Sequence, residues 1–243
     1  YAPVKAIREQ ISLPQELEYA SAWQTEILSD ATATRWIDVP AGSLRLMAEV
    51  LKRSHTTAKA DALWEAGDAD IMIGYDANND GEVQLREEAI CISLSEVVTD
   101  WCNINHPEPG RYWVVIHNFH HYYAERVTDT YDLAMAVVAA NQSAEFTAHT
   151  PSSSTGVDNV DLELEWNLHS SQKEDVYYAA FDLGSDAGNL GSLGMVPVKL
   201  TRAENDLTLK TSKTRARVGD VIDVTLSLQP NLTGADRQIA LNT

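Results

Sequence analysis

Short runs of β-branched and aromatic residues, separated by turn sequences, constrain the fold of this chain most strongly. The clearest run, residues 111–118, directly follows the turn sequence Pro-Glu-Pro-Gly at 107–110. Residues 131–137 have the pattern of a partner strand. The runs 36–39 and 44–50 flank a Pro-Ala-Gly turn, which favours a hairpin, although the second run also contains good helix formers. Strands of this length between turns predict an all-β fold made of β-sandwiches.

The spacing of these runs predicts tandem β-sandwich domains, the first jelly-roll-like and the second immunoglobulin-like. A Pro/Ser/Gly-rich break at 151–156 separates the first set of strands from a second set, which begins with the alternating apolar and acidic run at 160–166. The last strands in the sequence form a third β unit that is truncated or completes the second domain. The expected division is an N-terminal segment at 1–30, a first sandwich at 31–140, a second at 141–203 and the partial unit at 204–243.

A twelve-residue stretch between two predicted strands, residues 76–87, matches the calcium-loop pattern D-x-[DN]-x-[DN]-G-x5-E at every specified position. Calcium prefers about six to eight oxygen ligands, which such a loop supplies at alternate positions. Gly81 stands where the chain must turn sharply. The predicted ligands are side-chain oxygens of Asp76, Asn78 and Asp80, the backbone carbonyl of Glu82, Gln84 directly or through water, and two oxygens of Glu87.

The alternative for this stretch is an Asx-rich turn that binds no ion, because Asn and Asp side chains bond to their own backbone. A regulatory helix–loop–helix pair is not expected, since residues 70–74 on one flank have the pattern of a strand. We therefore expect a structural calcium ion in a β-rich protein.

The only two cysteines, Cys91 and Cys102, are close enough in sequence to form a hairpin-scale disulfide. A disulfide would indicate an oxidising compartment, in agreement with a calcium site outside the cytoplasm. The alternative is a pair of buried free thiols.

The charge of the chain argues against two classes of partner. The 36 acidic and 18 basic residues give a net charge of −18, which repels phosphate backbones and anionic membranes. No apolar run approaches the roughly 20 residues that a membrane helix needs. We expect an exported protein with no nucleic-acid partner and no membrane span.

Motifs of catalysis are missing from the sequence. It contains no G-x-S-x-G, no H-E-x-x-H and no phosphate-binding glycine loop. His117, His120 and His121 form a cluster, but His117 ends a strong strand pattern, so a solvated strand-end cluster is favoured over a metal or catalytic site. We expect no enzymatic activity in this chain.

Aromatic residues in and near the predicted strand at 111–118 suggest an alternative function for the chain. Trp113 and Tyr122 are candidates for a ligand surface, although such residues are more often core and rim than a binding platform. The alternative function is an extracellular carbohydrate- or protein-binding module that uses these aromatic side chains.

Several segments resemble a known family. The first part of the chain resembles the bacterial pre-peptidase C-terminal domain, through an Asp-rich strand, a Pro-x-x-Gly-x-Tyr strand, a Tyr-x-Leu strand and the two cysteines. The downstream segments are similar to the tails of secreted bacterial subtilisin-like serine proteases. The resemblance covers roughly residues 35–238 and is carried by residues 68–74, 107–116 and 130–133, and further downstream by 175–184, 189–202, 219–226 and 229–234.

This resemblance implies a secreted subtilase whose catalytic Asp, His and Ser lie upstream in another domain, since none of the subtilase motifs Asp-Ser-Gly, His-Gly-Thr or Gly-Thr-Ser-Met-Ala occurs here. The chain would be its non-catalytic C-terminal accessory region, which aids secretion, folding, stability or substrate contact. Its implied partners are the catalytic domain of the parent protease and a protein substrate.

Overall fold

Strands make up nearly all regular structure in the computed structural model, which confirms the all-β prediction. The chain separates into two compact units, residues 1–169 with 176–200 and residues 170–175 with 201–243. The expected boundaries at 30/31 and 140/141 therefore fall inside the first unit. The structure describes residues 1–16, 28–55, 67–95, 99–119, 128–141, 143–151, 154, 159–168, 171–186, 188–202, 207–215, 217 and 219–228.

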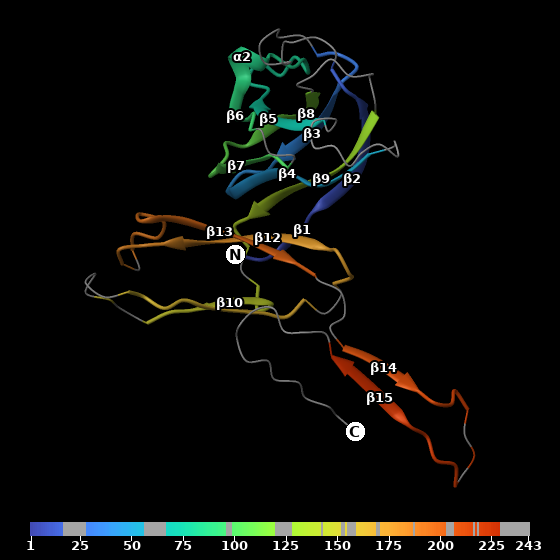
Figure 1. Cartoon of the computed structure of the whole chain (residues 1–243). Coiled ribbons are helices and arrows are strands. Elements are labelled where there is room, and N and C mark those ends of the chain that lie inside the picture. The colour runs from blue at the N-terminus through green and yellow to red at the C-terminus, as the bar shows by residue number, and fades with distance from the viewer. Residues whose placement is uncertain are drawn as a thin grey trace. The chain divides into compact units, whose positions relative to one another are not determined.

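Two four-stranded antiparallel sheets form a jelly roll in the first unit (Figure 1). From β2 to β9 the chain alternates between the sheets, except that β5 and β6 are neighbours in one sheet, and this connectivity confirms the jelly-roll prediction. The run at 44–50 lies in a strand and not in a helix. One sheet has the order β2 (Ile7–Pro14), β9 (Thr128–Ala139), β4 (Ser43–His55), β7 (Trp101–Asn105), and the other has β3 (Thr32–Val39), β8 (Gly110–Phe119), β5 (Asp68–Tyr75), β6 (Ala89–Ser93).

The central strand β8 is buried on both faces. Tyr112, Val114 and Ile116 point between the two sheets, where they pack in the main core. Trp113 and Val115 point to the outer face of their sheet and belong to a separate buried cluster. A strand whose two faces are both covered shows a continuous apolar run, as residues 112–116 do.

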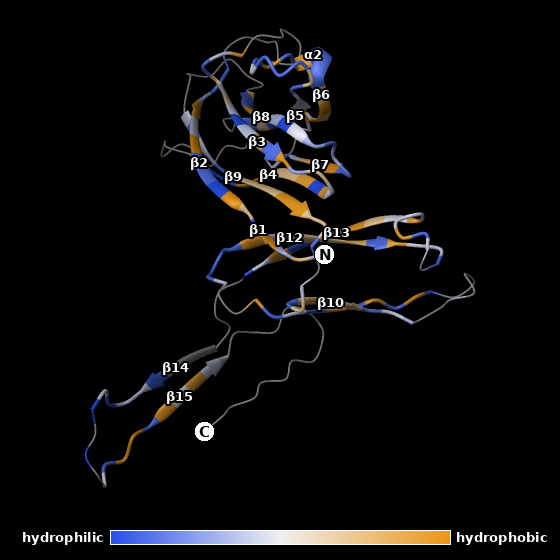
Figure 2. Cartoon of the chain, turned by 180° about the vertical axis from the view of Figure 1, so that it is seen from behind, coloured by the Kyte–Doolittle hydropathy of each residue, from blue (hydrophilic) through white to orange (hydrophobic). Residues whose placement is uncertain are grey.

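The strands β9 and β4 are also covered on both faces. Ala134, Ala136 and Val138 of β9 pack on the side away from the main core, against Tyr178 of β12 (Val176–Leu183), and Figure 2 shows hydrophobic colouring along β9. The Tyr178 hydroxyl donates a hydrogen bond to Glu49. Burial, together with this hydrogen bond, raises the pKa of Tyr178, so its hydroxyl stays protonated as a donor.

A second, smaller sandwich follows the jelly roll in the first unit. Its three-stranded sheet has the order β1 (Val4–Lys5), β12, β13 (Gly194–Thr201), and its two-stranded sheet pairs β10 (Phe146–His149) with β11 (Glu163–Trp166). Phe146, Ala179 and Val198 pack between the two sheets. The N-terminal segment thus supplies strands to two sheets. An immunoglobulin domain has about seven strands, more than the described strands here, so the immunoglobulin-like assignment stays a prediction.

The described strands of the second unit form one antiparallel hairpin, β14 (Leu207–Thr211) with β15 (Val224–Leu228). The hydrogen-bonded pairing of β15 begins at Val224, opposite Thr211. A lone two-stranded hairpin is marginally stable in water.

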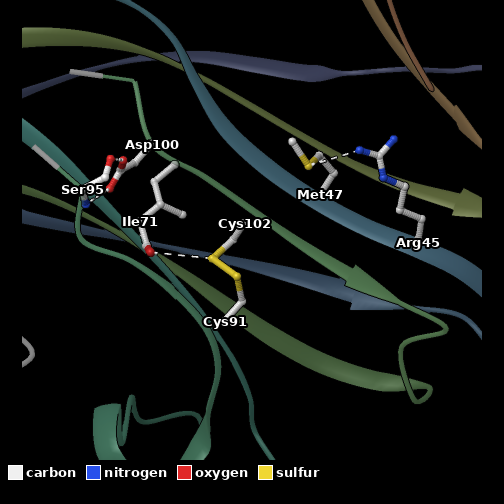
Figure 3. Close-up of a disulfide and its surroundings, with 7 residues drawn as sticks. All are labelled: Arg45, Met47, Ile71, Cys91, Ser95, Asp100 and Cys102. Carbon is white, nitrogen blue, oxygen red and sulfur yellow. Dashed lines mark hydrogen bonds between the residues drawn. A yellow bond between two sulfur atoms is a disulfide. The ribbon is translucent and has the colours of Figure 1, made fainter. Parts of the chain in front are cut away.

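The disulfide predicted between Cys91 and Cys102 is present, with 5.8 Å between the Cα atoms (Figure 3). Cys91 belongs to β6 and Cys102 to β7, which are edge strands of opposite sheets. The bond therefore joins the two sheets of the jelly roll at one open side. The Cys102 sulfur is fully buried, 3.7 Å from the carbonyl oxygen of Ile71.

We predict that replacing both cysteines by alanine lowers the free energy of unfolding by about 3 kcal/mol, because the bond closes a loop with a sequence separation of 11. Urea unfolding of the double variant and of the native chain gives this difference. The native chain measured with a reductant is the control, and it should lose a similar amount. An unchanged unfolding midpoint in both would contradict the prediction.

Candidate metal centre

The predicted calcium loop connects β5 to the short helix α2 (Leu85–Glu88), which lies beside β5 and β6 in Figure 1. Asn79 and Gly81 adopt positive φ values of 57° and 75°. Asn tolerates this conformation and glycine adopts it without strain. These two residues reverse the chain, so that the loop folds back over the outer face of the β3–β8–β5–β6 sheet.

Asp76 is the most buried acidic residue of the loop, with a side chain that is 0% exposed. Its Oδ2 atom accepts a hydrogen bond of 3.2 Å from the backbone N–H of Gly81 and lies 3.9 Å from a guanidinium nitrogen of Arg111. Its Oδ1 atom is buried and accepts no hydrogen bond from any residue that the structure describes. A buried carboxylate oxygen without a donor lowers stability unless a cation satisfies it.

The exposed residues of the loop are bonded to one another. The Asn78 side-chain oxygen accepts from the backbone N–H of Asp80 at 2.9 Å, and Asp80 Oδ1 accepts from that of Glu82 at 2.8 Å. Asp80 Oδ2 accepts from the side-chain amides of Asn78 and Gln84, each at 2.8 Å. The structure therefore gathers the predicted ligands Asn78, Asp80 and Gln84 in one network.

The two glutamates of α2 differ in their environments. Glu87, which the pattern assigns as a ligand, has an exposed side chain. Glu88, which the pattern does not specify, is buried: its Oε2 accepts from the Trp113 indole N–H at 2.8 Å and from the backbone N–H of Gln84 at 3.4 Å. Its Oε1 atom is buried and has no hydrogen-bond partner among the described residues. Figure 2 shows α2 as hydrophilic, in agreement with the exposure of Arg86 and Glu87.

An apolar cluster anchors the loop to the sheet. Leu85 of α2 packs with Met72 and Trp113, and Val83 of the loop is partly buried against them. Next to this cluster, the guanidinium carbon of Arg111 lies 4.0 Å from the centre of the Trp36 ring, as a cation–π contact. The loop therefore covers part of the hydrophobic surface of the sheet, and its conformation is coupled to that packing.

The oxygen atoms of this loop suit calcium better than a transition metal. Among the described residues, no three His, Cys, Asp or Glu side chains gather as a group that could hold a metal ion. A site here must also use amide and backbone oxygens, a mixed set that calcium accepts and zinc does not favour. Asp76 with its unpartnered buried oxygen is the observation that fits the ion.

The structure corrects the prediction of a ligand surface at Trp113. This residue is 0% exposed and lies in the cluster beneath the loop, because the outer face of its strand is covered. Tyr122, the other candidate, lies outside the described residues. The tryptophans that are more than half exposed in the described part of the chain are Trp101 (58%) and Trp166 (53%).

The histidine prediction also needs a correction. His117 is fully buried and is not part of a solvated cluster: its Nδ1 lies 3.1 Å from Asp70 Oδ2 and its Nε2 lies 3.9 Å from Glu16 Oε2. His120 and His121 lie outside the described residues. Asp70 is opposite His117 in the pairing of β5 with β8, a register that the sequence does not reveal.

No protein family model, no curated protein and no solved structure matches the chain. In the part of the chain that the structure describes, no helix is long and apolar enough to cross a membrane.

We predict that Gly74→Ala lowers the free energy of unfolding by about 1–3 kcal/mol. A Cβ atom at this position would lie 2.0 Å from a ring carbon of Trp113, so the indole would have to leave its position against β5. Urea unfolding measures the change. Gly188→Ala is the control, because its Cβ would meet only the exposed Asp186 carboxylate at 3.2 Å. Equal effects of the two substitutions would contradict the assigned contact.

Proposed function

We propose that this chain is the non-catalytic accessory region of an exported subtilase-family protease, and that a calcium ion bound at residues 76–87 stabilises its jelly roll. The observation that carries the calcium proposal is the buried Asp76 Oδ1 atom, which accepts no hydrogen bond within the described part of the chain. The protease relationship is supported by the sequence segments quoted above.

The metal-binding role follows from the oxygens that the loop gathers. Asp76, Asn78 and Asp80 supply side-chain oxygens, Glu82 its backbone carbonyl, and Gln84 an amide oxygen. The pattern adds Glu87. An unsatisfied buried polar atom typically costs about 1–3 kcal/mol, so an ion that coordinates Asp76 Oδ1 stabilises the folded state relative to the unfolded chain.

Export is supported by the combination of the disulfide and the loop. Disulfides persist in oxidising compartments. Calcium sites of extracellular modules commonly have dissociation constants of about 0.1–1 mM, which suit calcium-rich surroundings. A cytoplasmic protein would lack both conditions.

The accessory role has a physical rationale. A region attached to a protease is exposed to its cleavage, and cleavage tracks the population of locally open states when opening is fast. The disulfide and the calcium loop both hold β6, which is an edge strand and a natural point of opening. Calcium at about 100 times its dissociation constant adds about 2.7 kcal/mol to the free energy of unfolding.

We predict that calcium slows cleavage of the 76–88 region by a subtilisin-type protease, relative to excess chelator, and raises the melting temperature by roughly 5–10 °C. Gel analysis with mass spectrometry locates the cut, and calorimetry measures the melting temperature. Asp76→Asn is the matched variant, because it keeps the shape of the side chain and removes its charge. It should lose most of both calcium effects. Equal cleavage rates of the native chain with calcium and with chelator would contradict calcium stabilisation.

A second candidate function is a protein- or carbohydrate-binding module, and one observation favours it. The indole of Trp101, at the start of edge strand β7, is 58% exposed. Exposed tryptophan is enriched among residues that dominate binding energy at interfaces.

If this second function is correct, the chain should sediment with insoluble collagen, casein or chitin, and Trp101→Ala should reduce the bound fraction several-fold. Trp166→Ala, which removes another exposed tryptophan on a different sheet, is the control and should bind like the native chain. Absence of binding to all three materials would favour the accessory role alone.

A further inference from the structure

The two adjacent glutamates of α2 offer different carboxylates to the loop. Glu87 is exposed and its charge is solvated, whereas Glu88 is only 8% exposed. An ionised carboxylate is buried at a high free-energy cost unless hydrogen bonds or a cation compensate it. The buried member of the pair is therefore the one whose position needs an explanation.

The strand register places Glu88 next to the start of the loop. Ala89, the first residue of β6, pairs with Gly74 of β5. Glu88 therefore lies beside the end of β5, from which Asp76 begins the loop. On the other side of β5, Gly74 pairs with Trp113, whose indole lies over the glycine and reaches Glu88 with its N–H.

In the carboxylates of both Asp76 and Glu88, one oxygen accepts a hydrogen bond, and the other accepts none from the described residues. Asp76 Oδ2 is held by Gly81 and faces Arg111, and Glu88 Oε2 is held by Trp113 and Gln84. Asp76 Oδ1 and Glu88 Oε1 are both buried, and neither has a hydrogen-bond partner in the ranges that the structure describes. A divalent cation that bound both oxygens would compensate two buried carboxylates near the same end of β5.

We propose that Glu88, in place of Glu87, supplies the glutamate ligand from α2 to the calcium ion, and that Trp113 is the positioning residue that orients it. This proposal rests on the calcium binding proposed above. Because Trp113 holds Oε2, Glu88 coordinates calcium through Oε1 alone. The sequence pattern instead ends in a glutamate with two bound oxygens. The ion therefore links the loop to the apolar cluster around Trp113.

A purely structural role for Glu88, as the acceptor for the Trp113 N–H, is the rival explanation. Glu88→Gln separates the two roles, because the glutamine side-chain oxygen still accepts from the indole while the negative charge is lost. Under the structural role, calcium affinity stays unchanged. Under the ligand role, the affinity falls.

The test is isothermal titration of calcium chloride into the decalcified full chain, for the native protein, Glu88→Gln and Glu87→Gln. We expect Glu88→Gln to raise the dissociation constant about tenfold or more, and Glu87→Gln to change it less than about threefold, because calcium affinity follows the charge of the ligands. A large loss in Glu87→Gln with native-like binding in Glu88→Gln would overturn the ligand assignment and leave the calcium proposal standing. No calcium binding by the native chain would overturn both.

Trp113→Phe provides a second and independent variant. It retains a ring in the cluster and removes the N–H that orients Glu88, so we expect a loss of calcium affinity of about 10-fold or more, typical of residues that orient a metal ligand. In the Glu88→Gln background the same substitution should have little further effect on affinity. If Trp113→Phe lowers only the melting temperature of the calcium-free chain, Trp113 is not a positioning residue. If Glu88→Gln fails to fold, Trp113→Phe alone decides the proposal.

Discussion

The contact of Trp113 with Gly74 organises one face of the jelly roll. The absence of a side chain at Gly74 lets the indole lie flat against β5, and the indole N–H then reaches Glu88 at 2.8 Å. Leu85 and Val83 cover the same ring from above. A buried indole needs a hydrogen-bond partner, so this one side chain fixes the position of α2 and closes the loop over the sheet. The packing of the outer face and the geometry of the loop therefore depend on the same residue.

The strand β6 is restrained at its start and at its middle residue. Its first residue follows α2, and its third residue, Cys91, is bonded to β7 of the opposite sheet. Edge strands present unpaired backbone groups and are points of opening and misassociation. A five-residue edge strand with little packing of its own is stabilised here by a covalent bond on one side and by the loop on the other. The loop and the disulfide therefore both stabilise the same edge strand.

The sequence was sufficient for the all-β class, the position of most strands and the disulfide, because turn residues and β-branched runs are local signals. The sequence did not predict the burial of side chains whose surroundings depend on long-range strand pairing. Trp113 looked like a surface aromatic because the sequence does not reveal that a loop covers the outer face of β8. His117 looked solvated because its partner Asp70 is known only from the register of β5 with β8. The calcium pattern located the loop, but the difference between Glu87 and Glu88 depends on which face of α2 meets the sheet.

The burial of the two carboxylates also determines which ions can stabilise the loop. Exposed charges in a chain of net charge −18 are screened by ordinary salt over about 8 Å at physiological ionic strength. Asp76 and Glu88 are buried, so dissolved monovalent ions screen them poorly. Arg111 is 40% exposed and lies 3.9 Å from Asp76, so it compensates only part of the charge. The proposed calcium ion, with direct oxygen coordination, would compensate the remaining charge, and its binding would be specific to the folded loop because the unfolded chain does not bring the two oxygens together.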